Sequence, residues 1–135
     1  MADDQTYGEI QQIRAELRAH GGILRSLLYA QAGHITEEIL AEMREDPLLA
    51  RVFLLVDGLR TQRDIVMALA DQGISAASQS TVSRRMSRLT DDFGLIAPIG
   101  RGAEGGVAYQ TTPVAEALKV GRAAQRIIRE VESRP

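Results

Sequence analysis

Apolar residues recur at every third or fourth position along most of the chain, which predicts a mainly helical protein. Over residues 5–28 this pattern is interrupted by Gly21 and Gly22, so we expect either two helices or one bent helix there. Thr36 then precedes two glutamates, which suits the start of a short helix that ends near Asp46. The N-terminal third is therefore expected to contain only helices.

A central core helix is expected directly after this segment. The fixed φ angle of Pro47 suits the first position of a helix. Residues 48–56 are apolar on nearly every face. Gly58 follows, and glycine is the residue type that most easily adopts the left-handed conformation at a helix end. A helix that is apolar all round needs neighbours on every side, so we place it in the middle of the protein.

Another helix is predicted from Thr61 to Gly73. Thr61 and Asp64 have the spacing of a capping-box variant, in which each side chain binds the backbone N–H of the other residue. Its expected buried stripe consists of Ile65, Ala68 and Leu69. A polar turn follows it.

Residues 80–93 are the most informative segment. With an advance of about 100° per residue, large apolar side chains fall within one narrow stripe: Val82, Met86, Leu89 and Phe93. Hydroxyl and guanidinium side chains lie on the opposite face: Ser80, Ser87, Arg84 and Arg88, with Arg85 at the margin. We therefore expect a helix with a buried apolar back and a polar outer face.

A hairpin and a last helix complete the pattern. Residues 95–99 and 107–111 are predicted to be short strands joined by a glycine-rich tip. Pro98 indicates an edge strand, because proline cannot donate to a strand ladder. Thr112 and Pro113 start a final helix whose apolar spacing continues to the end of the chain.

Composition excludes several classes of function. The chain has 135 residues, 44% of them hydrophobic, which is enough for one soluble domain with a sizeable core. Without cysteine it forms no disulfide, thiolate zinc site or cysteine nucleophile. The two histidines, His20 and His34, lack metal-binding spacing, and no phosphate-cradling glycine motif is present. We therefore expect no enzyme activity, no cofactor and no metal site.

The sequence also predicts where the protein resides. No apolar run reaches the length of a membrane span, and the acidic start does not resemble a secretory signal. We therefore expect a cytoplasmic protein that does not interact with membranes.

Charge is unevenly distributed. Residues 1–57 hold 5 Arg against 10 Asp plus Glu, residues 58–105 hold 6 Arg against 5 acids, and residues 106–135 hold 5 bases against 3 acids. The net charge of -2 is not that of a strongly basic nucleic-acid binder. Binding to nucleic acid would therefore have to depend on a local cluster of basic side chains.

Residues 47–111 thus give, in order, helix, helix, turn, helix and a two-stranded hairpin. This order resembles the winged helix-turn-helix fold, and with helices on both sides the chain resembles the MarR-like transcriptional regulators. The resemblance is carried by residues 61–69, 80–89, 94–96 and 109–113. It implies an N-terminal helical segment (1–46), a winged helix-turn-helix domain (47–112) and a C-terminal helix (113–135).

The resemblance implies a sequence-specific DNA-binding transcriptional regulator, expected to be a repressor, that inserts residues 80–89 into the major groove of double-stranded DNA. That groove suits small or hydrogen-bonding side chains near the helix N-terminus and cations farther along. We expect Arg84 and Gln79 to read bases. Phosphate contacts are expected from Ser80, Thr81, Ser83 and Arg88. Arg85 is expected to lie on the same DNA-binding surface. Arg101, on the glycine-rich tip, could reach the adjacent minor groove.

The flanking helices have apolar stripes of their own. Related proteins read DNA as two-fold dimers, because one module of this size makes few base contacts. We expect a homodimer interface formed by the first helix (Ile10, Ile13, Leu17) and the last (Leu118, Ile127, Ile128, Val131), unless these helices pack on each other within one chain. The resemblance also allows a small-molecule effector, which the sequence does not identify.

Simpler interpretations stay open. An arginine-rich helix face is often only solvated, and a glycine-rich tip can be merely a flexible hairpin. As an alternative function, a winged-helix module can bind another protein without touching DNA, which the charge of only +1 over residues 58–105, from 6 Arg and 5 acids, favours.

Overall fold

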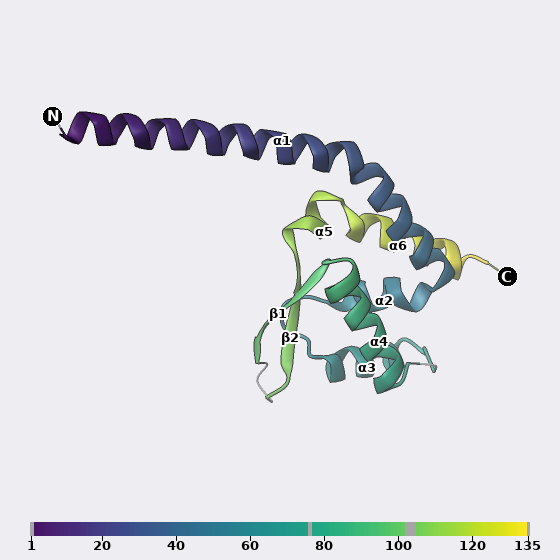
Figure 1. Cartoon of the computed structure of the whole chain (residues 1–135). Helices are drawn as coiled ribbons and strands as arrows, with labels where there is room; N and C mark the ends of the chain where they lie inside the picture. The colour runs from purple at the N-terminus through teal and green to yellow at the C-terminus, as the bar shows by residue number, and fades with distance from the viewer. Residues whose placement is uncertain (1, 76, 102–104, 135) are drawn as a thin grey trace. The chain divides into compact units, whose positions relative to one another are not determined.

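The computed structural model describes the backbone of residues 2–75, 77–101 and 105–134, and the side chains in these ranges other than 2–5 and 16–31. This part is mainly helical with one two-stranded antiparallel hairpin, as the sequence predicts (Figure 1). Its elements are α1 (Ala2–Glu45), α2 (Pro47–Leu55), α3 (Gln62–Asp71), α4 (Gln79–Ser87), η1 (Arg88–Asp92), β1 (Ile96–Arg101), β2 (Val107–Thr111), α5 (Pro113–Ala117) and α6 (Val120–Glu132). The chain divides into two compact units, Met1–Ile35 and Thr36–Pro135. None of the helices described here has both the length and the apolar character that crossing a membrane requires.

The first unit is the N-terminal part of α1. This helix runs through Gly21 and Gly22, which excludes the two-helix alternative, and through Thr36, so the predicted helix start at Thr36 is wrong. Glycine lowers helix stability by about 1 kcal/mol per residue without forbidding the conformation. Ile10 and Ile13 of the predicted apolar stripe are exposed, whereas the side chain of Leu17 lies outside those described.

The core of the second unit is built around α2. Five of its nine residues are buried: Leu49, Ala50, Val52, Phe53 and Leu55. The helix packs against α3, α4 and α6, and Figure 1 shows it between α6 and α3. Ile39 and Met43, near the end of α1, are buried in the same unit. The prediction of a central core helix opened by Pro47 is confirmed.

Both α3 and α4 begin with reciprocal caps. The Thr61 hydroxyl accepts the N–H of Asp64 (3.2 Å) and the Asp64 carboxylate accepts the N–H of Thr61 (3.0 Å), which confirms the predicted capping box. Ser78 and Thr81 form a second box at the start of α4, which the sequence analysis does not foresee. These caps satisfy N–H groups that have no partner within the helix, and so they fix where each helix begins.

The segment predicted as one helix over 80–93 contains two kinds of helix. α4 ends at Ser87, and η1 is a π-helical turn in which the N–H of Phe93 donates to the carbonyl of Arg88 (3.1 Å). Val82, Met86 and Leu89 are buried as predicted, but Phe93 is only half-buried. A π turn advances less than 100° per residue, which carries Phe93 off the apolar stripe.

The hairpin is fastened to the start of α3. β1 and β2 pair antiparallel, with an irregular register between Pro98 and Gly100. Thr61 forms a single bridge to Ala108 of β2. Gly106 approaches the same threonine so closely that an added Cβ would lie 2.9 Å from its Cγ2. The hairpin and α3 are therefore held at one point, beside the N-terminal cap of α3.

Asp57 organises the turn before α3. Its carboxylate accepts the N–H groups of Leu59 (2.9 Å) and Arg60 (2.8 Å). Gly58 adopts a φ of 85°, a conformation that favours glycine, and its N–H donates to the carbonyl of Tyr109 (2.7 Å). The turn thereby brings the chain alongside β2.

The C-terminal segment is divided into two helices. Lys119 adopts a left-handed conformation (φ 55°) between α5 and α6, so the predicted single helix from Pro113 is wrong. α6 packs on α2 and buries four side chains in its own chain: Val120, Ala124, Ile127 and Ile128. Ile127 and Ile128 are therefore not available for the predicted interface with another chain.

We predict that Leu69→Ala destabilises the protein by about 2–5 kcal/mol, because Leu69 is fully buried and its truncation leaves a cavity. Leu59→Ala is the matched control, since it removes the same atoms from a side chain that is 78% exposed. It should change the free energy of unfolding by less than about 0.5 kcal/mol. Urea unfolding followed by circular dichroism measures both, and equal effects would contradict the core described above.

The turn at Asp57 predicts a pH dependence. Desolvation raises the pKa of Asp57, but the N–H groups of Arg60 and Leu59 and the Arg60 guanidinium outweigh it, so the pKa lies below its ordinary value of 3.8. A carboxyl with a lowered folded-state pKa stabilises the fold above the ordinary pKa, and this stabilisation is lost as the pH falls through the folded value. We predict that Asp57→Ala lowers the urea midpoint near neutral pH and that the difference from the parent narrows below pH 3.8. A difference that persists undiminished into the acid range would contradict this.

Candidate nucleic-acid interface

The outer face of α4 presents three of the predicted contact residues to solvent. Gln79, Ser80 and Arg84 are exposed, and Ser83 is half-buried beside them. The opposite, apolar face of α4 is buried, which fixes the direction in which these side chains project. The first turn of α4 contains no acidic residue, so the partial positive charge of the helix N-terminus is not offset from within the helix.

Gln79 is positioned by a residue of the preceding helix. Nε2 of Gln62 donates to Oε1 of Gln79 (3.0 Å) and to the Gln79 carbonyl oxygen (3.2 Å). The amide nitrogen of Gln79 stays available as a donor, because only its oxygen is used in this contact. Gln62 is not among the predicted contact residues, although the capping box that starts at Thr61 already places it at the first position of α3.

The two hydroxyl residues at the start of α4 have different tasks. The Thr81 hydroxyl accepts the N–H of Ser78 (2.9 Å) and donates to the Ser78 carbonyl (3.0 Å), so it is used in the cap. The Ser80 hydroxyl lies 3.2 Å from that of Ser78 on the exposed surface. Of Ser80 and Thr81, Ser80 is therefore the better placed to bind an anion from outside the protein.

Arg85 is held within the chain. Its Nε and Nη2 bind the two carboxylate oxygens of Asp46 at 2.9 and 3.3 Å, and its Nη1 donates to the Thr81 carbonyl at 3.1 Å. The Arg85 side chain is 24% exposed. This residue links α4 to the junction of α1 and α2, and a phosphate contact from Arg85 would require the ion pair with Asp46 to open.

Arg88 is also engaged inside the protein. It forms ion pairs with Glu42 and, at 3.6 Å, with Asp92, and its guanidinium carbon lies 5.5 Å from the centre of the Phe93 ring. A DNA phosphate would have to compete with the carboxylates of Glu42 and Asp92 for the guanidinium of Arg88. Sequence spacing cannot reveal the partner at Glu42, because that residue precedes Arg88 by about a third of the chain.

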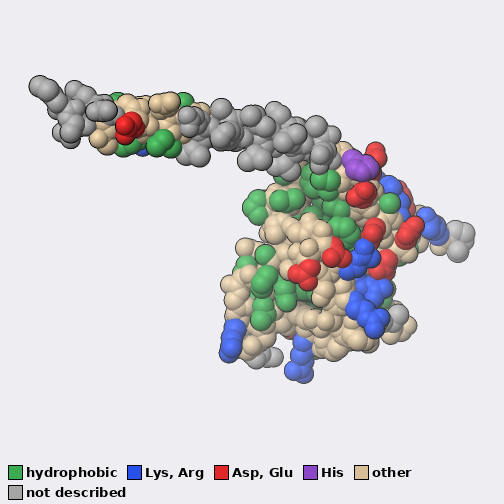
Figure 2. All heavy atoms as spheres, in the orientation of Figure 1, with side chains coloured by type: hydrophobic (Ala, Val, Ile, Leu, Met, Phe, Trp, Pro, Cys, Tyr) green, Lys and Arg blue, Asp and Glu red, His purple; other side chains and the backbone are tan. Residues whose placement is uncertain are grey.

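Other exposed arginines lie outside α4. Arg101 is exposed at the end of β1, while the tip residues 102–104 lie outside the described part of the chain. Arg63, next to Gln62 on α3, is exposed as well and is not among the predicted contacts. Figure 2 shows isolated cationic side chains at the lower edge of the molecule, whereas higher up, cationic and acidic side chains lie side by side. The exposed arginines Arg84, Arg63 and Arg101 come from three different elements, so they do not form a row along one helix.

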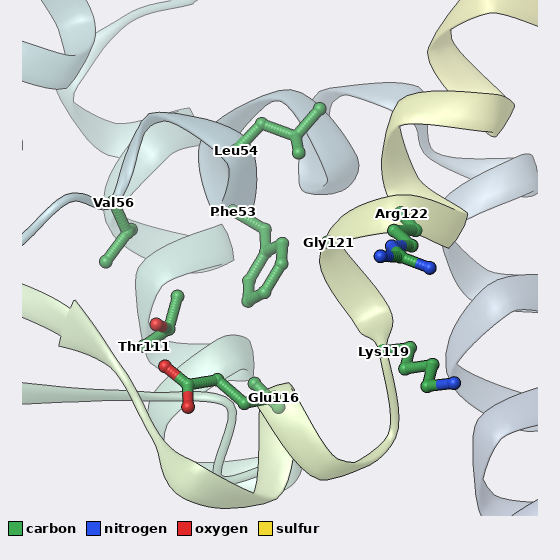
Figure 3. A pocket seen from close by; sticks show the side chains of 9 residues that line it. Phe53, Leu54, Val56, Thr111, Glu116, Lys119, Gly121 and Arg122 are labelled. Atoms are coloured by element: carbon green, nitrogen blue, oxygen red, sulfur yellow. The ribbon is translucent and has the colours of Figure 1, made fainter.

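A pocket of about 470 Å³ lies elsewhere in the second unit, between α2, the end of β2, α5 and α6. Its apolar lining includes Phe53, Leu54 and Val56. In Figure 3 the Glu116 carboxylate points toward Thr111, while the Lys119 side chain points away from Phe53. A small-molecule site needs polar groups that converge on one ligand, and these side chains do not converge. The expected effector gains no support from this pocket.

No group of three or more His, Asp or Glu side chains in the described residues could hold a metal ion. The chain matches no protein-family model, no curated protein and no solved structure with which it was compared. Its function has to be argued from the geometry of the site itself.

Proposed function

We propose that this chain is a sequence-specific DNA-binding protein of the winged helix-turn-helix type, a transcriptional repressor that inserts α4 into the major groove. The observation that carries the proposal is the set of exposed polar residues on α4, Gln79 and Ser80 in its first turn and Arg84 in its last, on a helix whose apolar face is buried in the core. The order of α2, α3, α4 and a hairpin fastened to the start of α3 supports it.

In this proposal each exposed side chain has a distinct role. Arg84 donates to guanine, and the positioned amide of Gln79 reads a second base. Ser80 and the N-terminus of α4 bind phosphate, as helix N-termini commonly do. Arg63 and Arg101 flank them, Arg101 toward the minor groove. With two or three phosphates neutralised, the logarithm of affinity should fall with the logarithm of salt concentration with a slope of about −2 to −3 per protomer.

One observation favours the second candidate, a winged-helix module that binds protein and not DNA. Arg85 and Arg88 are neutralised by Asp46, Glu42 and Asp92, which leaves few cations to meet phosphates. The salt dependence of binding separates the two candidates, since release of counterions is a property of nucleic acid.

We predict that Arg84→Ala weakens binding to duplexes selected from random sequence by about 5- to 150-fold, the equivalent of 1–3 kcal/mol for one base contact, and relaxes the preference at one base position. Arg44→Ala is the matched control, because Arg44 is exposed in the last turn of α1. Fluorescence anisotropy at two salt concentrations measures both. A parent protein that shows no salt-dependent binding to any duplex would favour the protein-binding candidate.

We also propose that the protein acts as a homodimer through α1. Tyr7, Ile10 and Ile13 are exposed large apolar residues at helical spacing near its N-terminal end. A solvated helix without tertiary packing is marginally stable, so such a stripe favours a partner helix. Two copies would supply two α4 helices for half-sites about 34–36 Å apart.

We predict that Ile10→Lys/Ile13→Lys converts the dimer to a monomer, since four charges would be buried in a two-fold interface. Gln11→Lys/Gln12→Lys adds the same charge at neighbouring exposed positions off the stripe. This variant should have the same oligomeric state as the parent protein. Sedimentation velocity measures the state of each. A monomeric parent, or two variants that behave alike, would overturn the dimer proposal.

A further inference from the structure

α6 carries a strongly basic outer face that no part of the proposed function uses. Its apolar residues are buried on one side, and Arg122, Arg126 and Arg129 are exposed on the other. At about 100° per residue these three guanidinium groups fall within a sector of roughly 60°. Lys119, also exposed, directly precedes them. The helix therefore presents a straight row of cations.

These cations are not neutralised by neighbouring acids. In the described part of the chain, Arg122, Arg126 and Arg129 form no ion pair, in contrast to Arg85 and Arg88. The acids on α6 itself are Glu130, which is exposed, and Glu132, which pairs with Arg51 at 3.5 Å. A chain with a net charge of -2 thus concentrates positive charge at this helix.

The basic face of α6 points away from the proposed recognition surface. α6 packs on α2, and α3 and α4 pack on α2 as well. Figure 1 shows α2 between α6 and α3. Because both α6 and α4 turn their apolar faces inward, their polar faces open on different sides of the second unit. We therefore expect that one straight duplex docked on α4 does not reach the row of arginines.

We propose that the exposed face of α6 is a second, sequence-independent binding surface for the phosphate backbone of duplex DNA, so that the protein holds two DNA segments at once. This inference rests on the proposed function only in taking α4 as the site of the first duplex. From Arg122 to Arg129 the helix rises about 10 Å, and measured along the duplex axis one DNA strand carries about three phosphates over that length. Three arginines meet that spacing, and arginine binds phosphate bidentately.

The chemistry of the face disfavours other polyanions. A membrane surface would require an apolar face for insertion, and that of α6 is buried in the protein. Single-stranded nucleic acid is held by aromatic stacking, and α6 contains no aromatic residue. An acidic protein partner would need apolar or aromatic anchors, whereas the exposed side chains between the arginines are polar or small.

The test is a capture experiment with the full chain. One duplex is immobilised and saturated with protein, and capture of a second, labelled duplex of unrelated sequence is measured. Arg122→Gln/Arg126→Gln should reduce this capture by about tenfold or more at 0.1 M salt, while affinity for a single duplex stays within about twofold. Glutamine keeps helix propensity and removes repulsion between like charges four residues apart, so the fold should be retained.

The matched control is Arg44→Gln/Arg134→Gln, which removes the same charge from exposed positions outside α6 and should leave capture unchanged. Equal capture by both double variants would overturn the inference, as would a loss of single-duplex affinity in the α6 variant. Inhibition of capture by poly-glutamate as effective as by unlabelled duplex would overturn it in favour of an acidic protein partner. If Arg84→Ala weakens single-duplex binding while both double variants capture the second duplex equally, the proposed function stands and the α6 inference fails. If Arg84→Ala leaves single-duplex binding intact, the proposed function itself fails.

Discussion

Burial of the apolar residues of α2 against three other helices is the constraint on which the second unit depends. Leu49, Ala50 and Val52 are fully buried, and a buried aliphatic side chain of valine or leucine size contributes about 1.5–3 kcal/mol. α3, α4 and α6 each turn one apolar face toward this helix. The same packing that forms the core thereby decides which faces remain outside. The polar face of α4 and the arginines of α6 are exposed because their opposite faces are needed inside.

Ion pairs around α4 set geometry and local charge more than stability. The pair between Arg85 and Asp46 is partly exposed, and such pairs contribute at most about 1 kcal/mol. Their larger consequence is that two arginines of the predicted contact set face acids of the same chain. The candidate interface is left with hydroxyls, an amide and well-separated cations, a composition suited to reading bases with modest electrostatic attraction.

Charge on this protein is therefore arranged in opposite ways on two helices. On α4 and η1, acids from elsewhere in the fold neutralise Arg85 and Arg88 and leave Arg84 exposed. On α6 no such acids are present among the described residues, and the arginines stand in a row. The first arrangement fits selective contacts with base edges, and the second fits contacts with a uniform phosphate backbone. A net charge near zero is compatible with both, since each depends on a local surface.

Local chemistry allowed much of this fold to be predicted from the sequence. Pro47 marks the start of the core helix, Thr61 and Asp64 mark the start of α3, and the spacing of Val82, Met86 and Leu89 identifies the buried side of α4. Each of these signals acts over a few residues, where side chain and backbone meet directly. The exposed positions of Ser80 and Arg84 follow from the same helical spacing.

Tertiary structure alone decided the rest. The left-handed Lys119 divides the last helix into α5 and α6, and the π turn of η1 displaces Phe93 from the stripe expected for a regular helix. Arg85 and Arg88 meet Asp46 and Glu42 only when α4 packs beside the end of α1. A sequence determines which helices form and which side of each is apolar, because those depend on neighbours within a few residues. Which charge faces which acid depends on the packing of distant segments, and only the folded chain brings them together.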